Sequence, residues 1–258
     1  MQVEGTQAQP VSPDKSRPEW RIERKFYIVP RNIGFAYALL RQVCRLDSQY
    51  PEEQINSLYF DTADLEQHSR SLSGDFRKDK VRIRWYGSEE SCGDTVPVFL
   101  ELKSREGFSS TKRRHRLPVP AEDLELSRLG QGIVPKSTLV NTMAGFGHFP
   151  DSPIYPIIRI SYWRYRFTEM LTGVRVALDC HIRSTMMARE LGHGERELEL
   201  PGGVIEVKGG SMEIPITLRR IKIMDLDWSR FSKYSFCIDS HSEKLGTVAR
   251  LSPSGRVL

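Results

Sequence analysis

The segment Val81-Arg82-Ile83-Arg84-Trp85 alternates between apolar and basic side chains at every position. In a β-strand successive side chains point to opposite faces, so residues two apart share a face. Arg82 and Arg84 are therefore expected together on one face, with the three apolar side chains opposite them. This alternation predicts a strand of a sheet that is packed on one side and strongly basic on the other.

The same pattern recurs in five further segments, where lysines and arginines with single carboxylates among them share one face: Arg21–Lys25, Val98–Arg105, Ser110–Leu117, Val174–Asp179 and Ile205–Lys208. An antiparallel sheet with one face in water would explain any single strand of this kind. Six such strands favour another explanation, because exposed faces usually carry more Ser, Thr and Gln. A shared interior filled by a ligand accounts for both the repetition and the composition.

The whole chain has the pattern of a mainly β protein of the α+β class. We expect strands at Arg21–Val29, Ile55–Phe60, Lys80–Tyr86, Val98–Arg105, Ser110–Leu117, Ile157–Phe167, Val174–Ile182, Glu195–Leu200 and Val204–Lys208. Apolar spacing predicts a few helices, at Arg31–Cys44, Ala121–Leu129, Lys136–Met143 and Ile216–Met224. If the sheet closes into an antiparallel barrel of about eight strands, the basic face lines a lumen and the helices pack outside.

Length and composition fit one domain. The 258 residues, 39% of them apolar, suffice for one substantial core, which we place at 20–240 between a leader at 1–19 without apolar periodicity and a tail at 241–258. No segment resembles a signal peptide or a transmembrane helix. The four cysteines lack metal-ligand or disulfide spacing, which favours a reducing, cytoplasmic location.

A lumen with so many like charges requires an anionic ligand, because lysines and arginines repel one another in a low-dielectric cavity. A chain of phosphates fits, since guanidinium groups bind phosphate oxygens in bidentate fashion and ammonium groups add point charge. The glutamates Glu23, Glu101 and Glu206 then need a purpose of their own. A divalent cation, Mg²⁺ or Mn²⁺, that bridges carboxylate and phosphate oxygens would provide it.

Nine short motifs occur in a specific order: Glu-Arg-Lys-Phe-Tyr-Ile at 23–28, Ser-Leu-Tyr-Phe-Asp-Thr at 57–62, Val-Arg-Ile-Arg-Trp-Tyr-Gly at 81–87, Leu-Glu-Leu-Lys at 100–103, Ser-Thr-Lys-Arg-Arg at 110–114, Arg-Ile-Ser-Tyr-Trp-Arg at 159–164, Arg-Val-Ala-Leu-Asp at 175–179, Ile-Glu-Val-Lys at 205–208 and Phe-Ser-Lys-Tyr at 231–234. They resemble the triphosphate tunnel metalloenzymes of the CYTH-like superfamily, and within it the VTC branch. The resemblance runs from about Arg21 to Ile238 and implies a tunnel-shaped barrel that makes inorganic polyphosphate from ATP.

The resemblance implies that ten cations hold the triphosphate and the growing chain: Lys25, Arg82, Arg84, Lys103, Lys112, Arg114, Arg159, Arg175, Lys208 and Lys233. It implies Glu206 as the main ligand of Mn²⁺ or Mg²⁺, with Glu23 and Glu101 as further metal-binding carboxylates. Members of the family often work beside a membrane protein that receives the product, although no segment of this chain indicates such a partner.

Four further residues belong to the expected substrate site. Ser57, Tyr59 and Asp61 match a strand near the nucleotide end of the tunnel, with a purely structural role as the alternative for Tyr59. Arg164 lies five residues after Arg159, so a regular strand sends the two side chains to opposite faces. Both could point into the tunnel only if a β-bulge separated them.

One departure from the wider family bears on the activity. The hydrolase and cyclase relatives begin with Glu-x-Glu-x-Lys, whereas Arg21 here replaces the first glutamate, as in the polymerase branch. The departure weakens two alternatives without excluding them, namely cyclisation and the hydrolysis of tripolyphosphate or a nucleoside triphosphate. A non-catalytic binder of polyphosphate or nucleotide is another alternative. Nucleic-acid binding is disfavoured, because Phe26, Tyr27 and Trp85 lie within or beside the apolar pattern instead of forming exposed platforms.

Overall fold

A computed structural model describes residues 21–87, 94–107, 109–188, 196–211, 213–224, 228–229 and 231–242. The expected leader at 1–19 lies outside these ranges, as do Cys92 and nearly all of the expected tail at 241–258. Within the described ranges, no helix combines the length and apolar character needed to cross a bilayer.

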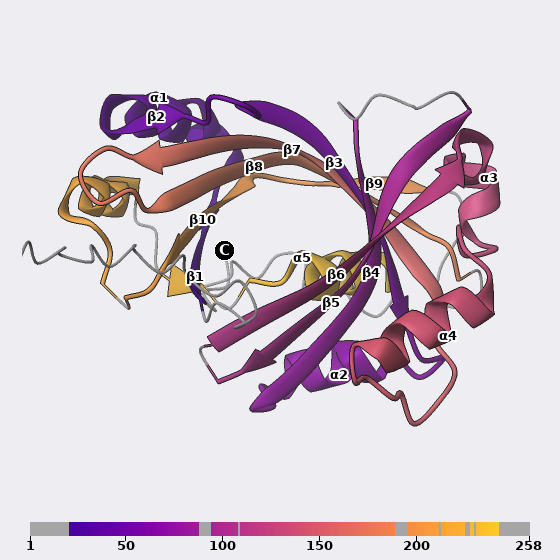
Figure 1. The fold of residues 1–258 in the computed structure, drawn as a ribbon. Helices are drawn as coiled ribbons and strands as arrows, with labels where there is room; N and C mark the ends of the chain where they lie inside the picture. The colour runs from indigo at the N-terminus through magenta and orange to yellow at the C-terminus, as the bar shows by residue number, and fades with distance from the viewer. Residues whose placement is uncertain are drawn as a thin grey trace, which may run out of the picture.

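Eight antiparallel strands close into a ring (Figure 1), which confirms the predicted barrel. In ring order they are β7 (Tyr155–Glu169), β3 (Glu52–Asp61), β4 (Arg77–Tyr86), β5 (Thr95–Glu106), β6 (Ser109–Pro120), β1 (Arg21–Ile28), β10 (Gly203–Gly209) and β8 (Arg175–Met186), which pairs back to β7. Three short strands extend the sheet: β2 (Cys44–Leu46), β9 (Glu197–Leu200) and β11 (Trp228–Ser229). Each predicted strand corresponds to an observed one, and β2 and β11 were missed because two or three residues show no alternation.

Two groups of helices cover the outer, apolar face of the ring. On one side, α1 (Ile33–Val43) and the 3₁₀ helix Ile216–Met224 pack on β1, β10 and β8. On the other side, β3 to β5 are covered by α3 (Leu126–Leu129) and α4 (Lys136–Gly145). A short 3₁₀ helix precedes α1 at Pro30–Asn32, and another precedes α3 at Ala121–Leu124. The apolar side chains between the arginines of β4 belong to this second cluster, as their alternation predicts.

The last helix, α5 (Lys233–His241), is the exception to the expectation that helices pack outside. Its residues Tyr234, Cys237 and Ile238 share an apolar cluster with Ile158 and Ile160 of β7. These isoleucines lie on the inner face of β7, because strand register pairs them with the inward positions of β3. Figure 1 shows α5 within the ring of strands. The barrel interior therefore has an apolar half filled by α5 and a charged half that remains open.

The sequence did not predict α5 or α2 (Glu66–Leu72), because α2 has no apolar stripe and the stripe of α5 is limited to Tyr234, Cys237 and Ile238. In α2 the buried side chain is His68, and α5 buries Lys233 and Ser235 beside its apolar residues. The carboxylate of Asp61 holds α2 in place instead, since it accepts hydrogen bonds from the backbone N–H groups of Gln67 and His68 at 2.9 and 3.0 Å.

The turn between β9 and β10 requires glycine at position 202. Gly202 has a φ of +88°, and a Cβ atom there would lie 2.2 Å from the carbonyl oxygen of Ile28. We expect Gly202→Ala to lower the free energy of unfolding by about 2 kcal/mol or more, because both the backbone conformation and the close contact become strained. Urea denaturation measures this change. The matched control is Gly210→Ala, which meets nothing within 4 Å and should change stability by less than about 0.5 kcal/mol. Equal stability of the two variants would contradict this account.

Candidate functional site in the barrel interior

The open half of the barrel is a cavity of about 880 Å³ with a strongly basic lining. Among the described residues, thirteen lysines and arginines line it, against the four carboxylates Glu23, Asp47, Asp75 and Glu206. The cations come from seven strands and from α5. The predicted convergence of basic side chains around one channel is therefore present.

Eight of the ten predicted cations line the cavity: Lys25, Arg82, Arg84, Lys103, Lys112, Arg175, Lys208 and Lys233. Arg164, whose direction the sequence left open, also lines it. The side chain of Arg21 lies outside the described part of the chain, so its predicted role stays a prediction.

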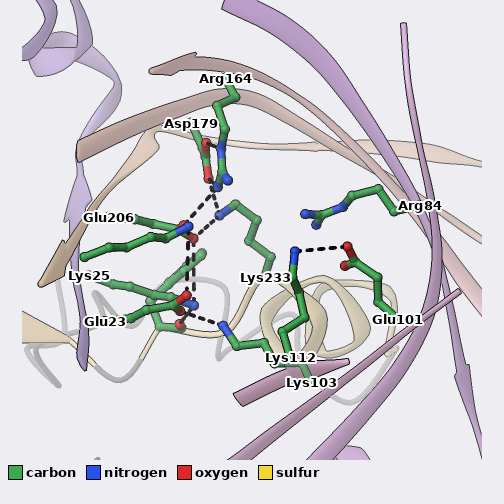
Figure 2. A network of polar contacts seen from close by, with 12 residues as sticks. Glu23, Lys25, Arg84, Glu101, Lys103, Lys112, Arg164, Asp179, Glu206 and Lys233 are labelled. Atoms are coloured by element: carbon green, nitrogen blue, oxygen red, sulfur yellow. Dashed lines mark hydrogen bonds and ion pairs between the residues drawn. The ribbon is translucent and has the colours of Figure 1, made fainter. Parts of the chain in front are cut away.

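A network of ion pairs around Glu206 organises one wall of the cavity (Figure 2). Its two carboxylate oxygens lie 2.9 Å from Lys233 and Arg164 respectively, and Lys208 and Lys25 follow at 3.2 and 3.9 Å. These cations come from α5, β7, β10 and β1. Glu206 therefore joins four elements through charge.

Asp179 of β8 completes this wall. It is fully buried, and its two oxygens accept hydrogen bonds from Arg164 at 2.6 and 2.7 Å while one of them also pairs with Lys233. The sequence placed Asp179 on the charged face without assigning it to the site. Its pairing with Arg164 depends on the register between β7 and β8, which sequence alternation does not define.

A second network surrounds Glu101 on the opposite wall. This fully buried carboxylate accepts hydrogen bonds from Arg82 at 2.7 and 2.9 Å and pairs with Lys112 at 3.3 Å and Arg114 at 3.4 Å. Arg114 does not line the cavity but holds this carboxylate from β6 while its guanidinium lies over the ring of Phe99. Glu101 is thus a buried counter-ion of the predicted cations.

Glu23 links the two walls. Its carboxylate accepts a hydrogen bond from Lys103 of β5 at 2.6 Å and lies 3.9 Å from Lys208 of β10. Figure 2 shows Lys103 reaching from the side of the Glu101 network towards Glu23. A single acidic side chain on β1 therefore holds cations from two separate strands.

Burial and charge shift the pKa values of these groups in opposite directions. Burial alone would raise the pKa of the Glu206 carboxyl, but the nearby charges of Lys233 and Arg164 hold it well below its usual range. Burial lowers the pKa of Lys25 to about 8, because the attraction of Glu206 offsets the effect of burial only in part. The pKa of Lys80 lies well below its usual value, since burial and the charges of Lys25 and Lys103 both disfavour its protonated form.

The structure corrects the predicted position of Arg159. Its strand position pairs with Leu58 on the outer face, and its side chain contacts Asn56 at 3.1 Å and Glu197 at 3.5 Å. The pairing of β7 with β8 is irregular between Ser161 and Trp163, but the register of β7 with β3 stays regular from Arg159 to Arg164, so Arg164 points inward. Arg159 therefore follows regular alternation and lies outside the cavity.

The three predicted substrate residues of β3 divide into different environments. Tyr59 lines the cavity, and its hydroxyl accepts a hydrogen bond from Arg82 at 3.0 Å. Ser57 is fully buried behind Arg84 and accepts its hydrogen bond at 3.2 Å. Asp61 does not line the cavity but accepts a 2.6 Å hydrogen bond from Tyr234, which does. The prediction that Asp61 contacts substrate directly is therefore corrected: it holds α2 and Tyr234 in place.

Sequence analysis missed four cations in the cavity lining, Lys78, Lys80, Arg105 and Arg166. The first two continue the alternation of Arg82 and Arg84 towards the start of β4, which begins at Arg77, three residues before its predicted start. Extending the alternation by two more pairs of residues would have found them. Arg105 and Arg166 were included in predicted strands but not assigned to the site.

The carboxylates suit a metal ion only in part. In the described ranges no group of three or more His, Cys, Asp or Glu side chains could hold a metal. Glu206 and Glu23 line the cavity and could share an ion with phosphate oxygens, because Mg²⁺ commonly binds one or two carboxylates together with substrate phosphates. Glu101 does not fit this role, since both of its oxygens are buried against cations.

Removing the charge of Asp179 should destabilise the barrel strongly. Asp179→Asn leaves Arg164 and Lys233 with one fewer buried counter-ion, so we expect the free energy of unfolding to fall by about 3 kcal/mol. Urea denaturation measures the loss. The control Glu122→Gln breaks an exposed ion pair with Arg128 and should cost less than about 1 kcal/mol. A loss for Asp179→Asn no larger than that of the control would show that this network contributes little.

Binding of an anion should weaken as the pH rises through about 8, where Lys25 loses its charge. A bound phosphate favours the protonated lysine, so binding of tripolyphosphate near this pH should take up protons. Calorimetry in buffers of different ionisation enthalpy measures the uptake. The Lys25→Arg variant keeps a positive charge at this position at high pH, so it should take up fewer protons than the wild type. Protons taken up by the ligand itself contribute equally to both measurements. Identical proton uptake by the two proteins would contradict this assignment.

Comparison with known proteins places the fold and the cavity in context. Residues 20–241 match the VTC domain family. Similar solved structures include a proposed adenylate cyclase from Bacillus halodurans, with 16% identity and a TM-score of 0.49 over 82% of this chain and 93% of that chain. Another is a proposed adenylyl cyclase from Hippeastrum described with a dominant triphosphatase activity, with 15% identity and a TM-score of 0.46 over 88% of this chain and 98% of that chain. No curated protein sequence matches. Because the family match spans most of the chain, this protein belongs to the VTC domain family.

Proposed function

We propose that this chain is a metal-dependent polyphosphate polymerase, which transfers the γ-phosphate of ATP to a growing inorganic polyphosphate chain. The observation that carries the proposal is the cavity of about 880 Å³, in which thirteen cations face four carboxylates. Membership of the VTC domain family supports a function with polyphosphate or triphosphate. The cavity has more positive charge than a single triphosphate would neutralise, so a second anionic chain could bind there as the acceptor.

The arrangement suits phosphoryl transfer, which depends mainly on alignment and on neutralisation of charge. Arg82, Arg84 and Lys233 are held from different directions by Glu101, Ser57 and Glu206, so their charges are fixed before substrate arrives. In the proposed reaction a terminal phosphate oxygen of the acceptor attacks the γ-phosphorus. The bond from that phosphorus to the β,γ-bridging oxygen breaks, and ADP leaves with this oxygen.

Glu206 and Glu23 are the proposed ligands of Mn²⁺ or Mg²⁺, shared with phosphate oxygens of the substrate. A bound ion would neutralise negative charge on the phosphates. The contribution of the chain itself is the fixed set of cations, which orients the phosphates and stabilises charge that develops during transfer.

The test is incubation with ATP and Mn²⁺, followed by detection of polyphosphate on a gel. We expect the double variant Arg82→Ala/Lys103→Ala to lower polymer formation by about 100-fold or more, because it removes two fixed charges from the wall that β4 and β5 form. Arg159→Ala is the matched control, since this arginine lies on the outer face. Undiminished synthesis by the double variant would overturn the proposed role of the cavity.

The product separates polymerisation from the alternatives on the same fold. Orthophosphate without polymer would indicate hydrolysis of the triphosphate, with water as the acceptor. Tight binding of polyphosphate without any turnover of ATP would indicate a non-catalytic binding protein. Either result would overturn the polymerase assignment while leaving the anion-binding role of the cavity intact.

A further inference from the structure

A row of cations on β4 and β5 continues beyond the Glu101 network. Strand register pairs Arg82 with Glu101, then Lys80 with Lys103, and then Lys78 with Arg105. The three pairs lie two residues apart, so their side chains share the inner face. All five cations line the same cavity.

The row is longer than the site proposed for the triphosphate. From Arg82 to Lys78 the strand advances four residues, about 13 Å. In the structure Glu101 holds Arg82, whereas the carbonyl oxygens of Ser71 and Gly107 hold Lys78 and Arg105 at the other end of the row. An anion that contacts both ends with the side chains in these positions must be an extended chain.

Lys80, in the middle of the row, is poorly compensated. Its Nζ donates a hydrogen bond to Ser232 Oγ at 2.7 Å and lies 5.7 Å from the ring centre of Tyr234. In the described part of the chain it has no carboxylate partner, unlike Lys103 and Arg82. A half-buried cation without a counter-ion is costly, and a bound phosphate would compensate it.

The cavity lining beside Lys78 and Arg105 is small and polar. It includes Ser71, Gly74, Gly107, Ser110 and Thr111. Lys78 is held towards α2 through a 3.5 Å contact with the carbonyl oxygen of Ser71, and Arg105 donates to the carbonyl oxygen of Gly107 at 2.8 Å. Small residues between the cations leave space for an extended anion.

The lining contributed by β7 and β8 combines three arginines with the apolar residues Phe167, Val176 and Ala177. The apolar groups give a phosphate chain no donors, and two of the arginines, Arg164 and Arg166, already pair with the buried carboxylates of Asp179 and Glu53. Among the described parts of the lining, the β4–β5 row therefore offers the better path for a polyanion.

We propose that Lys78, Lys80 and Arg105 bind the acceptor polyphosphate beyond its reacting end, so that this row of β4 and β5 is the path of the chain out of the site. The inference rests on the proposed function, because it takes a phosphate chain as the ligand. It adds that affinity depends on chain length, with Lys80 contacting short and long chains and the Lys78–Arg105 pair contacting long chains alone.

Binding of tripolyphosphate and of long-chain polyphosphate to the full chain, measured by calorimetry, tests this path. The wild type should bind the long chain more tightly per molecule. Lys78→Gln/Arg105→Gln should lose on the order of tenfold in affinity for the long chain, with a much smaller loss for tripolyphosphate. Lys80→Gln should weaken both. Arg77→Gln, an exposed neighbour on β4 whose guanidinium pairs with Glu106, should leave both affinities unchanged.

Urea denaturation of each variant shows that it is folded before the affinities are compared. A double variant with the length preference of the wild type, or a wild type without any length preference, would overturn the proposed path.

Polymer synthesis from ATP separates this inference from the proposed function. If the path is correct, the Lys78/Arg105 double variant should make shorter polymers than the wild type. Polymers of equal length from both proteins would overturn the path while polymerisation stands. The wild type could instead make no polymer and still bind long chains more tightly through Lys78 and Arg105. That result would overturn the polymerase assignment and support the binding path.

Discussion

Compensation of charge inside the barrel is the constraint on which the rest of the structure depends. Lysines and arginines from seven strands and from α5 face one cavity, where their mutual repulsion would oppose closure of the ring. Three carboxylates offset much of this repulsion at separate points: Asp179 and Glu206 on one wall and Glu101 on the other. Each holds cations from more than one element, so the same ion pairs that reduce the repulsion also fix the relative positions of strands and helix.

This arrangement links stability to binding. The buried carboxylates keep the cations charged and oriented, but they do not neutralise all of them, as Lys80 shows. An anion would supply the missing compensation and favour the protonated lysine, and the distribution of the cations over two walls suits an extended anion better than a compact one. The apolar packing of α5 inside the ring holds this helix in position, and its first residue Lys233 therefore lies beside Glu206 and Asp179.

Much of the fold and of the site could be predicted because alternation along a strand is a local property. Arg82 and Arg84 share a face whatever their neighbours are, and the predicted inner cations of β1, β5 and β10 follow from the same rule. The same rule explains why Arg159 lies outside the cavity. It lies five positions before Arg164, and regular alternation sends the two side chains to opposite faces. Asp61 was misassigned because its partners, the backbone of α2 and the hydroxyl of Tyr234, lie in helices that the sequence did not predict.

The sequence by itself determined which side chains share a face, that the chain forms a mainly β structure, and that one face is rich in cations. These properties depend on the two-residue period of a strand and on side-chain chemistry, both readable from neighbouring residues. Only the tertiary structure decided that α5 occupies half of the interior, that Asp179 pairs with Arg164, and that the glutamates serve as counter-ions of the cations. These depend on register and ring closure, which bring together residues far apart in the chain, and such pairings leave no local pattern in the sequence.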